Sequence, residues 1–107
     1  MSRSTKARFA LIHEDATLPN VATAESAGYD LYLCQDELLG PGSVTLLRTG
    51  IVAKPPPGYH FELCLRSSVP VKCPGLVLAN GIGVIDADYC GAEDEIKIPV
   101  LNTDSAT

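Results

Sequence analysis

The most telling stretch of this chain runs Tyr59-His60-Phe61-Glu62-Leu63-Cys64-Leu65-Arg66. Large apolar side chains occupy its odd positions, and His, Glu, Cys and Arg occupy the even ones. Because successive side chains of a β-strand point to opposite faces, this two-residue period predicts a strand. We expect one face of that strand to meet the core and the other to face away from it.

The same period recurs at residues 96–101, where Ile, Ile and Val alternate with Lys, Pro and Leu. Pro99 has no backbone donor, which predicts that this strand lies on a sheet edge there. No window of the sequence has a helical period. Shorter apolar runs are separated by Gly/Pro turn signals; the runs lie at residues 9–12, 44–47 and 76–79, and the turns at 40–42, 55–58 and 74–75. This punctuation predicts an all-β fold, a sandwich or a barrel.

The composition indicates one domain spanning residues 1–107. The net charge of −5 argues against a nucleic-acid-binding surface. No apolar stretch has the length of a membrane span, so we expect no membrane partner. Residues 1–7 are expected to be a flexible start, because no apolar signal-peptide core follows this basic segment. We therefore expect a cytoplasmic protein.

Four cysteines are present, and none forms a Cys-x-x-Cys pair: Cys34, Cys64, Cys73 and Cys90. With only two histidines in the chain, this spacing does not predict a zinc site. We expect the cysteines to be buried or half-buried reduced thiols.

Residues 83–91 read Gly-Val-Ile-Asp-Ala-Asp-Tyr-Cys-Gly and place two carboxylates and a ring between glycines. Asp86 and Asp88 are two apart, so in an extended chain they point the same way. The flanking glycines permit turn conformations. We expect a β-hairpin that presents a carboxylate and a ring to something small. An ordinary solvated turn is the alternative, since Asp and Gly are common turn residues.

Three short motifs carry a resemblance to a known family: residues 27–33 (AGYDLYL), 65–68 (LRSS) and 80–91. In this order they resemble signature motifs of the trimeric dUTPase family, and the resemblance covers roughly residues 8–102. It implies a distorted jelly roll, in agreement with the strand pattern. It also implies a homotrimer with sites between subunits that hydrolyses dUTP to dUMP and pyrophosphate with Mg²⁺.

The resemblance assigns different tasks to two carboxylates. Asp86 would be the catalytic base that orients the water attacking the α-phosphate; its alternative role is a turn cap. Asp30 would touch the metal through water, as Mg²⁺ keeps several waters and binds few protein carboxylates. The alternative for Asp30 is a strand-end carboxylate that accepts hydrogen bonds from local amides. Asp88 is expected to be structural or solvent-facing.

The Arg-Ser-Ser motif would hold the phosphates. A guanidinium and hydroxyls are suited to phosphate oxygens, so Arg66, Ser67 and Ser68 are expected substrate contacts. An alternative role for Arg66 is a salt bridge between subunits, and Ser67 could instead cap a turn or helix.

Specificity would come from the third motif. The resemblance implies that the ring of Tyr89 packs against the sugar and leaves no room for a ribose 2′-hydroxyl, although packing in the protein is an alternative for a lone tyrosine. The amide of Asn80 complements the edge of uracil. The backbone of Gly83, Val84 and Ile85 would supply the remaining donors and acceptors and so reject cytosine.

The chain departs from the family pattern in two places. The loop at residues 71–75 is slightly longer than usual. The 107 residues also do not include the Arg-Ile-Ala-Gln strand and Gly-rich arm with which the family continues, so we expect a chain truncated relative to the family, and a poorly active one.

Two other functions remain open from the sequence. One is the related dCTP deaminase, which needs a proton-moving carboxylate after Gly91, where Glu93, Asp94 and Glu95 lie. The other is a non-catalytic relative that binds a nucleotide or a protein.

Overall fold

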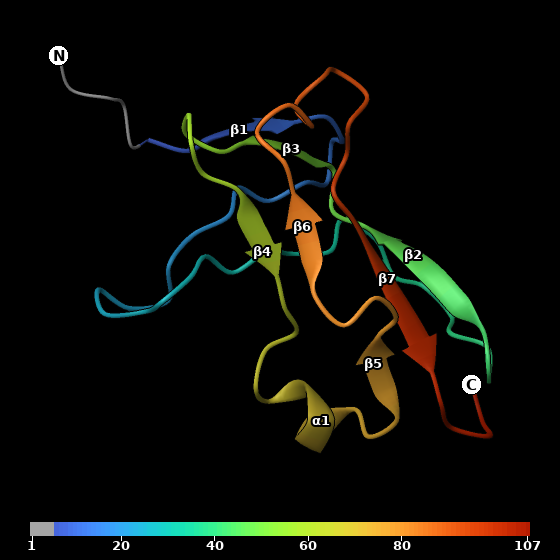
Figure 1. The fold of residues 1–107 in the computed structure, drawn as a ribbon. Coiled ribbons are helices and arrows are strands. Elements are labelled where there is room, and N and C mark those ends of the chain that lie inside the picture. Colours follow the sequence, from blue (N-terminus) through green and yellow to red (C-terminus); the bar gives the residue numbers. More distant parts are fainter. Residues whose placement is uncertain (1–5) are drawn as a thin grey trace, which may run out of the picture.

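The computed structural model describes residues 6–107, and this part consists almost wholly of strands and loops (Figure 1). Residues 1–5 of the expected flexible start lie outside it. The elements are β1 (Arg8–Leu11), β2 (Val44–Arg48), β3 (Ile51–Lys54), β4 (Phe61–Leu63), α1 (Val69–Lys72), β5 (Leu76–Leu78), β6 (Gly83–Ile85) and β7 (Lys97–Asn102). The predicted all-β, jelly-roll type of fold is confirmed. The sequence pattern did not predict the single turn of helix in α1, which forms part of the loop between the second and third motifs.

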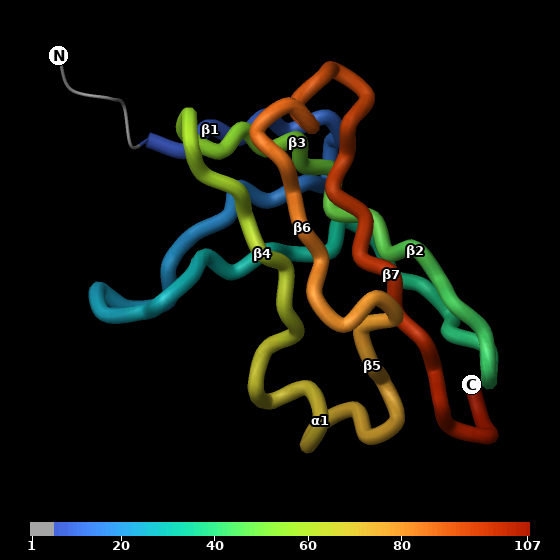
Figure 2. The backbone as a smooth tube through the Cα atoms, in the orientation of Figure 1, coloured from blue at the N-terminus to red at the C-terminus, as the bar shows by residue number. Residues whose placement is uncertain are grey.

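The strands pair antiparallel in three small sheets, in the orders β1-β3, β2-β7-β5 and β4-β6. Partners are mostly distant in sequence: Val44 faces Leu101, and Phe61 faces Ile85. Figure 2 follows the backbone as β7, close to the C-terminal end, returns between β2 and β5. Such crossed pairings connect segments far apart in the sequence, as expected for a jelly-roll type of fold.

The prediction that Pro99 marks an edge strand is wrong. β7 is the central strand of its sheet, between β2 and β5. Pro99 accepts a bond from Ala79 N–H at 2.8 Å, just beyond the last residue of β5. The position at which Pro99 lacks a backbone N–H therefore lies just beyond the end of the β5–β7 ladder. No hydrogen bond inside that ladder is lost.

The alternation within β7 is confirmed, because Ile98 and Val100 are buried while Lys97 is exposed. Two apolar clusters form the core; one contains Leu47, Leu78, Ile98 and Val100, and the other Ile51, Ala53, Ile85 and Ile96. In residues 59–66 only Phe61–Leu63 pairs as a strand, and Phe61, Leu63 and Leu65 are half-buried. The inward face of this stretch is therefore only partly covered.

The cysteines are free thiols, but only two of the four fit the expected burial. Cys34 is buried and Cys90 half-buried, while Cys64 and Cys73 are exposed. Cys64 occupies an outward position in the alternation of residues 59–66, which accounts for its exposure. Among residues 6–107, no helix is long and apolar enough to cross a lipid bilayer.

The chain exposes more surface than a monomer of its size. Its radius of gyration is 14.8 Å, against about 13 Å expected for 107 residues. Its accessible surface is 7385 Å², against roughly 5,700 Å² for a folded 11.3 kDa monomer. Large apolar side chains contribute, including Leu38, which is 86% exposed, and Val71, which is 81% exposed. Exposed apolar surface of this extent is typical of a chain that packs against a partner.

Candidate active site

A groove of about 370 Å³ follows β6, within the range of about 300–1,000 Å³ that small-ligand pockets occupy. Its walls include Leu46, Leu63, Glu93, Lys97 and Pro99. Six residues that the sequence predicted as site residues also line it: Asn80, Gly83, Val84, Ile85, Asp86 and Tyr89. The structure therefore brings the predicted site residues of the third motif to one concave surface.

The close approach of β4 and β6 in the wall of the groove depends on Gly83. Gly83 and Leu63 are register partners of β6 and β4, and both line the groove. A Cβ atom at position 83 would lie 3.1 Å from the Cβ of Leu63. Only glycine lets the two strands approach this closely without a shift of Leu63.

The expected hairpin at residues 83–91 is wrong. β6 ends at Ile85 and pairs with β4, not with the chain that follows it. The N–H of Tyr89 donates to the carbonyl of Asp86 at 3.1 Å, which closes a turn. A second turn follows, in which Gly91 N–H donates to the Asp94 carboxylate at 2.9 Å. The turns nevertheless place an exposed carboxylate, Asp86, and a ring, Tyr89, at the groove.

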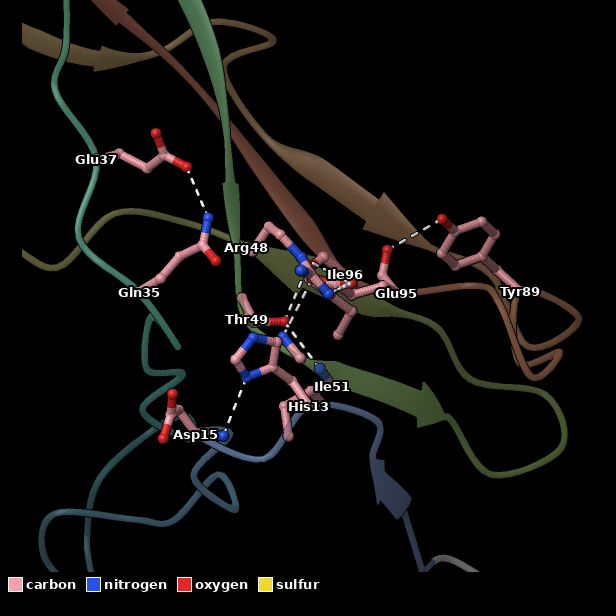
Figure 3. A network of polar contacts seen from close by, with 11 residues as sticks. His13, Asp15, Gln35, Glu37, Arg48, Thr49, Ile51, Tyr89, Glu95 and Ile96 are labelled. Atoms are coloured by element: carbon pink, nitrogen blue, oxygen red, sulfur yellow. Dashed lines mark hydrogen bonds and ion pairs between the residues drawn. The ribbon is translucent and has the colours of Figure 1, made fainter.

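Tyr89 is held at its tip. Its hydroxyl donates to the main-chain carbonyl oxygen of Glu95 at 3.1 Å, as Figure 3 shows. The residue stays 43% exposed and lines the groove. The ring is therefore presented to the groove with its hydroxyl tied back to the protein.

Glu95, which also lines the groove, forms an ion pair with the half-buried Arg48 (Figure 3). The Glu95 side chain is 6% exposed. Its carboxylate accepts a hydrogen bond from Nη2 of Arg48 at 2.9 Å and two from Nε at 3.1 and 3.2 Å. The N–H of Gly50 donates to the same carboxylate at 3.2 Å. The hydrogen bonds from Arg48 hold the pKa of the Glu95 carboxyl below its ordinary value, against the opposing effect of burial. The same pair raises the pKa of Arg48.

Gly50 makes this network possible. Its φ is 67°, and a Cβ atom there would lie 2.6 Å from the Cβ of His13. The left-handed turn between β2 and β3 aims its N–H at Glu95. The Arg48–Glu95 pair was missed from the sequence because 47 positions separate its members and no short motif joins them. Residues 49–51 read Thr-Gly-Ile and resemble the family beside Arg48, but they do not indicate a partner for it.

The pair predicts a pH-dependent contribution to stability. Because the pKa of Glu95 is lowered on folding, its contribution is fully present above the ordinary value of 4.5 and is lost as pH falls through the lowered pKa. We expect Glu95→Gln to lower Tm by about 5–10 °C at pH 7, and by progressively less below about pH 4.5. Thermal unfolding of both proteins from pH 7 to pH 3 measures this.

The exposed Glu93 provides the control, because Glu93→Gln removes an acid from the same segment at the surface. A Tm difference for Glu95→Gln that stays constant down to pH 3 would show that the ion pair is not its source.

The first two motifs, residues 27–33 and 65–68, lie outside the groove. Asp30 and Arg66 form an ion pair at 3.3 Å, in which the Arg66 side chain is 68% exposed. Arg66 therefore has a partner within its own chain and retains a largely accessible guanidinium. Ser67 is exposed, and Ser68 begins α1 without a side-chain capping bond. None of these four residues lines the groove.

The register of β4 and β6 explains this separation. Arg66 follows the C-terminal end of β4, and Asp86 follows the C-terminal end of β6. Because the two strands are antiparallel, these ends lie at opposite ends of the pair (Figure 1). With about 3.3 Å per extended residue, Arg66 and Asp86 are roughly 20 Å apart along the strand direction.

No group of three or more His, Cys, Asp or Glu side chains within residues 6–107 is arranged to hold a metal. Asp30 is a single carboxylate whose side chain is 21% exposed. Mg²⁺ needs only one or two protein carboxylates when phosphates and waters fill its other positions. The donor set around Asp30 therefore fits a magnesium ion that arrives with a triphosphate, and not one held in a protein cage.

Comparisons with known proteins show what this chain is similar to. The deoxyuridine 5′-triphosphate nucleotidohydrolase of Thermobifida fusca is 42% identical over 93 residues, which cover 87% of this chain and 50% of that protein. The chain thus spans about half the length of this curated relative.

Two solved structures have the same fold. The Staphylococcus bacteriophage 80alpha dUTPase with dUPNHPP has a TM-score of 0.82 and 28% identity, over 94% of this chain and 56% of that one. A point mutant of the dUTPase from phage phi11 of S. aureus, solved to describe the coordination of a structural Mg(II) ion, has a TM-score of 0.81 and 30% identity, over 92% and 60% of the two chains.

The dUTPase family model matches residues 14–107, which include all three motifs, the groove and the Arg48–Glu95 pair. Given that match and a curated relative at 42% identity, the chain belongs to the dUTPase family.

Proposed function

We propose that the protein hydrolyses dUTP to dUMP and pyrophosphate with Mg²⁺. The observation that supports this most is the groove along β6, because one family-matched segment provides its polar amide, its strand backbone, its carboxylate and its ring. The Thermobifida fusca relative is a deoxyuridine 5′-triphosphate nucleotidohydrolase, and the phage 80alpha dUTPase was solved with dUPNHPP.

In this proposal the groove binds the deoxyuridine. The Asn80 amide, with a donor and an acceptor, pairs with the edge of uracil. The backbone of Gly83–Ile85 supplies the other polar contacts, and the Tyr89 ring packs against the sugar. A base with the opposite pattern would leave buried polar groups unpaired, which is costly and rejects cytosine.

Asp86 is the proposed base. It follows the last residue of β6, is exposed, and lines the same groove. A carboxylate placed within hydrogen-bond reach of a water can orient that water and accept its proton during attack on the α-phosphate. The proton passes to Asp86, the water oxygen bonds to the α-phosphorus, and the bond from that phosphorus to the α,β-bridging oxygen breaks, so that pyrophosphate leaves with that oxygen.

Asp30, Arg66, Ser67 and Ser68 are the proposed phosphate and metal contacts. The exposed guanidinium of Arg66 and the two hydroxyls would bind phosphate oxygens. Asp30 would hold Mg²⁺ through water, and the ion, when bound, would neutralise charge on the phosphates.

The two halves of the proposed site must come from different subunits. Asp86 and the phosphate contacts must meet at one α-phosphate, yet within one chain the antiparallel β4–β6 pair holds Asp86 and Arg66 roughly 20 Å apart. A neighbouring copy would bring its Asp30 and Arg-Ser-Ser segment to the groove. A closed ring of three such contacts gives a homotrimer, and the exposed apolar surface of the single chain supports an assembly.

The structure argues against Glu95 as the proton carrier of the deaminase alternative, which leaves Glu93 as the other acidic candidate that lines the groove. A carboxylate that carries protons works best with a pKa near the working pH. Glu95 lines the groove, but Arg48 holds its pKa below the ordinary value and its oxygens accept four hydrogen bonds. Glu95 is thus a structural anion.

A nucleotide panel tests the proposal. We expect pyrophosphate release from dUTP with Mg²⁺, and little or none from UTP or dCTP. Ammonia release from dCTP would instead support the deaminase, and binding of dUTP without turnover would support a non-catalytic relative. Either result would contradict the proposed function.

The assembly is a separate expected result. Multi-angle light scattering at micromolar concentration should give about three times the 11.3 kDa chain mass. A shared site requires that activity and assembly fall together on dilution. A monomer at a concentration where dUTP is hydrolysed would overturn the shared-site account.

A further inference from the structure

The direction of the Tyr89 ring depends on the position of one carbonyl group. Tyr89 ends the turn that Asp86 begins, and its hydroxyl donates to the Glu95 carbonyl oxygen at 3.1 Å. The residue is 43% exposed, so packing alone does not enclose the ring. A shift of the Glu95 carbonyl would therefore move or release the ring that borders the groove.

That carbonyl is restrained by the backbone on its C-terminal side and by the Glu95 side chain. On its C-terminal side, Ile96 N–H donates to Ile51 at 2.8 Å, and the Thr49 hydroxyl donates to the Ile96 carbonyl at 2.6 Å. On its N-terminal side lies the exposed turn of residues 91–94. The Glu95 side chain itself supplies the other restraint, through Arg48 and the Gly50 N–H.

We infer that the half-buried Arg48–Glu95 pair is a positioning element for Tyr89, and that it thereby sets how strictly the groove rejects a ribose 2′-hydroxyl. The pair touches neither sugar nor phosphate in this account; it acts through the tyrosine hydroxyl. The effect on sugar choice rests on the proposed function, whereas the positioning of the ring rests only on the contacts of these residues.

Two substitutions weaken the pair while keeping the ring. Glu95→Gln preserves shape, removes the charge and leaves an Arg48 side chain that is 36% exposed, whereas Arg48→Gln leaves the buried Glu95 carboxylate without its cation and is the harsher change. We expect each to lower the preference for dUTP over UTP roughly tenfold, chiefly by improving turnover of UTP. Asn102→Ala is the matched control, because Asn102 is 8% exposed, lies at the far end of β7, the strand that follows Glu95, and donates to the carbonyls of Leu39 and Ala106 away from the groove.

A double-mutant cycle separates positioning from general destabilisation. Tyr89→Phe keeps the ring and removes the hydroxyl that Glu95 holds. If Glu95 acts through that hydroxyl, Glu95→Gln added to Tyr89→Phe should change the dUTP/UTP preference no further. Additive effects, or an equal loss of preference in Asn102→Ala, would overturn the positioning role.

A measurement that does not depend on enzymatic activity completes the test. Protein labelled with 3-fluorotyrosine has four tyrosines, and Tyr89→Phe identifies the ¹⁹F resonance of Tyr89. Glu95→Gln and Arg48→Gln should shift or broaden that resonance and leave the other three in place. An unmoved Tyr89 resonance would overturn the inference. A moved resonance in a protein that does not hydrolyse dUTP would uphold the positioning and contradict only the proposed function.

Discussion

Asp86→Asn is expected to lower the turnover of dUTP by about two to four decades while dUTP still binds. The amide keeps the size of the side chain but cannot accept the proton of the attacking water. Asp86 is exposed, so the substitution should leave the fold and the Tm unchanged. Steady-state pyrophosphate release, with the dissociation constant of a non-hydrolysable dUTP analogue, measures both quantities.

Asp88→Asn is the matched control, since Asp88 is also exposed, lies two residues away and does not line the groove. We expect that variant to keep near-normal turnover. If Asp86→Asn also kept near-normal turnover, another group would have to serve as the base.

Tyr89→Ala should lower the preference for dUTP over UTP by about 10- to 100-fold, which is the typical discrimination between two substrates that differ by one group in a pocket. Removing the ring opens the space that a 2′-hydroxyl needs, so kcat/KM should rise for UTP and fall for dUTP. The ratio of the two specificity constants is the measurement.

Tyr59→Ala controls for the loss of an exposed tyrosine, since Tyr59 is 57% exposed and lies outside the groove. An unchanged ratio in Tyr89→Ala would mean that the ring does not crowd the sugar.

The strand content could be predicted from local patterns, but the pairing could not. The period in residues 96–101 correctly identified which side chains of β7 are buried. It could not reveal that β2 and β5 flank this strand, because pairing depends on segments about 20 to 60 positions away. The error at Pro99 has the same origin: whether a missing donor matters depends on where a neighbouring strand ends.

In the candidate site, too, local segments could be predicted from the sequence and contacts between distant residues could not. The six predicted residues of the third motif lie within ten positions of one another, so a short motif could identify this part of the groove. The predicted hairpin was wrong because β6 pairs with β4, where Gly83 permits close approach to Leu63. The Arg48–Glu95 pair joins the end of β2 to the segment before β7, 47 positions away, so no short motif could identify it.

The most direct test of the account is hydrolysis of dUTP with Mg²⁺ in ¹⁸O-labelled water, followed by mass spectrometry of both products. Attack on the α-phosphate by a water that Asp86 orients predicts one ¹⁸O atom in dUMP and none in pyrophosphate. Label in pyrophosphate, release of dUDP with orthophosphate, or no hydrolysis at all would contradict it.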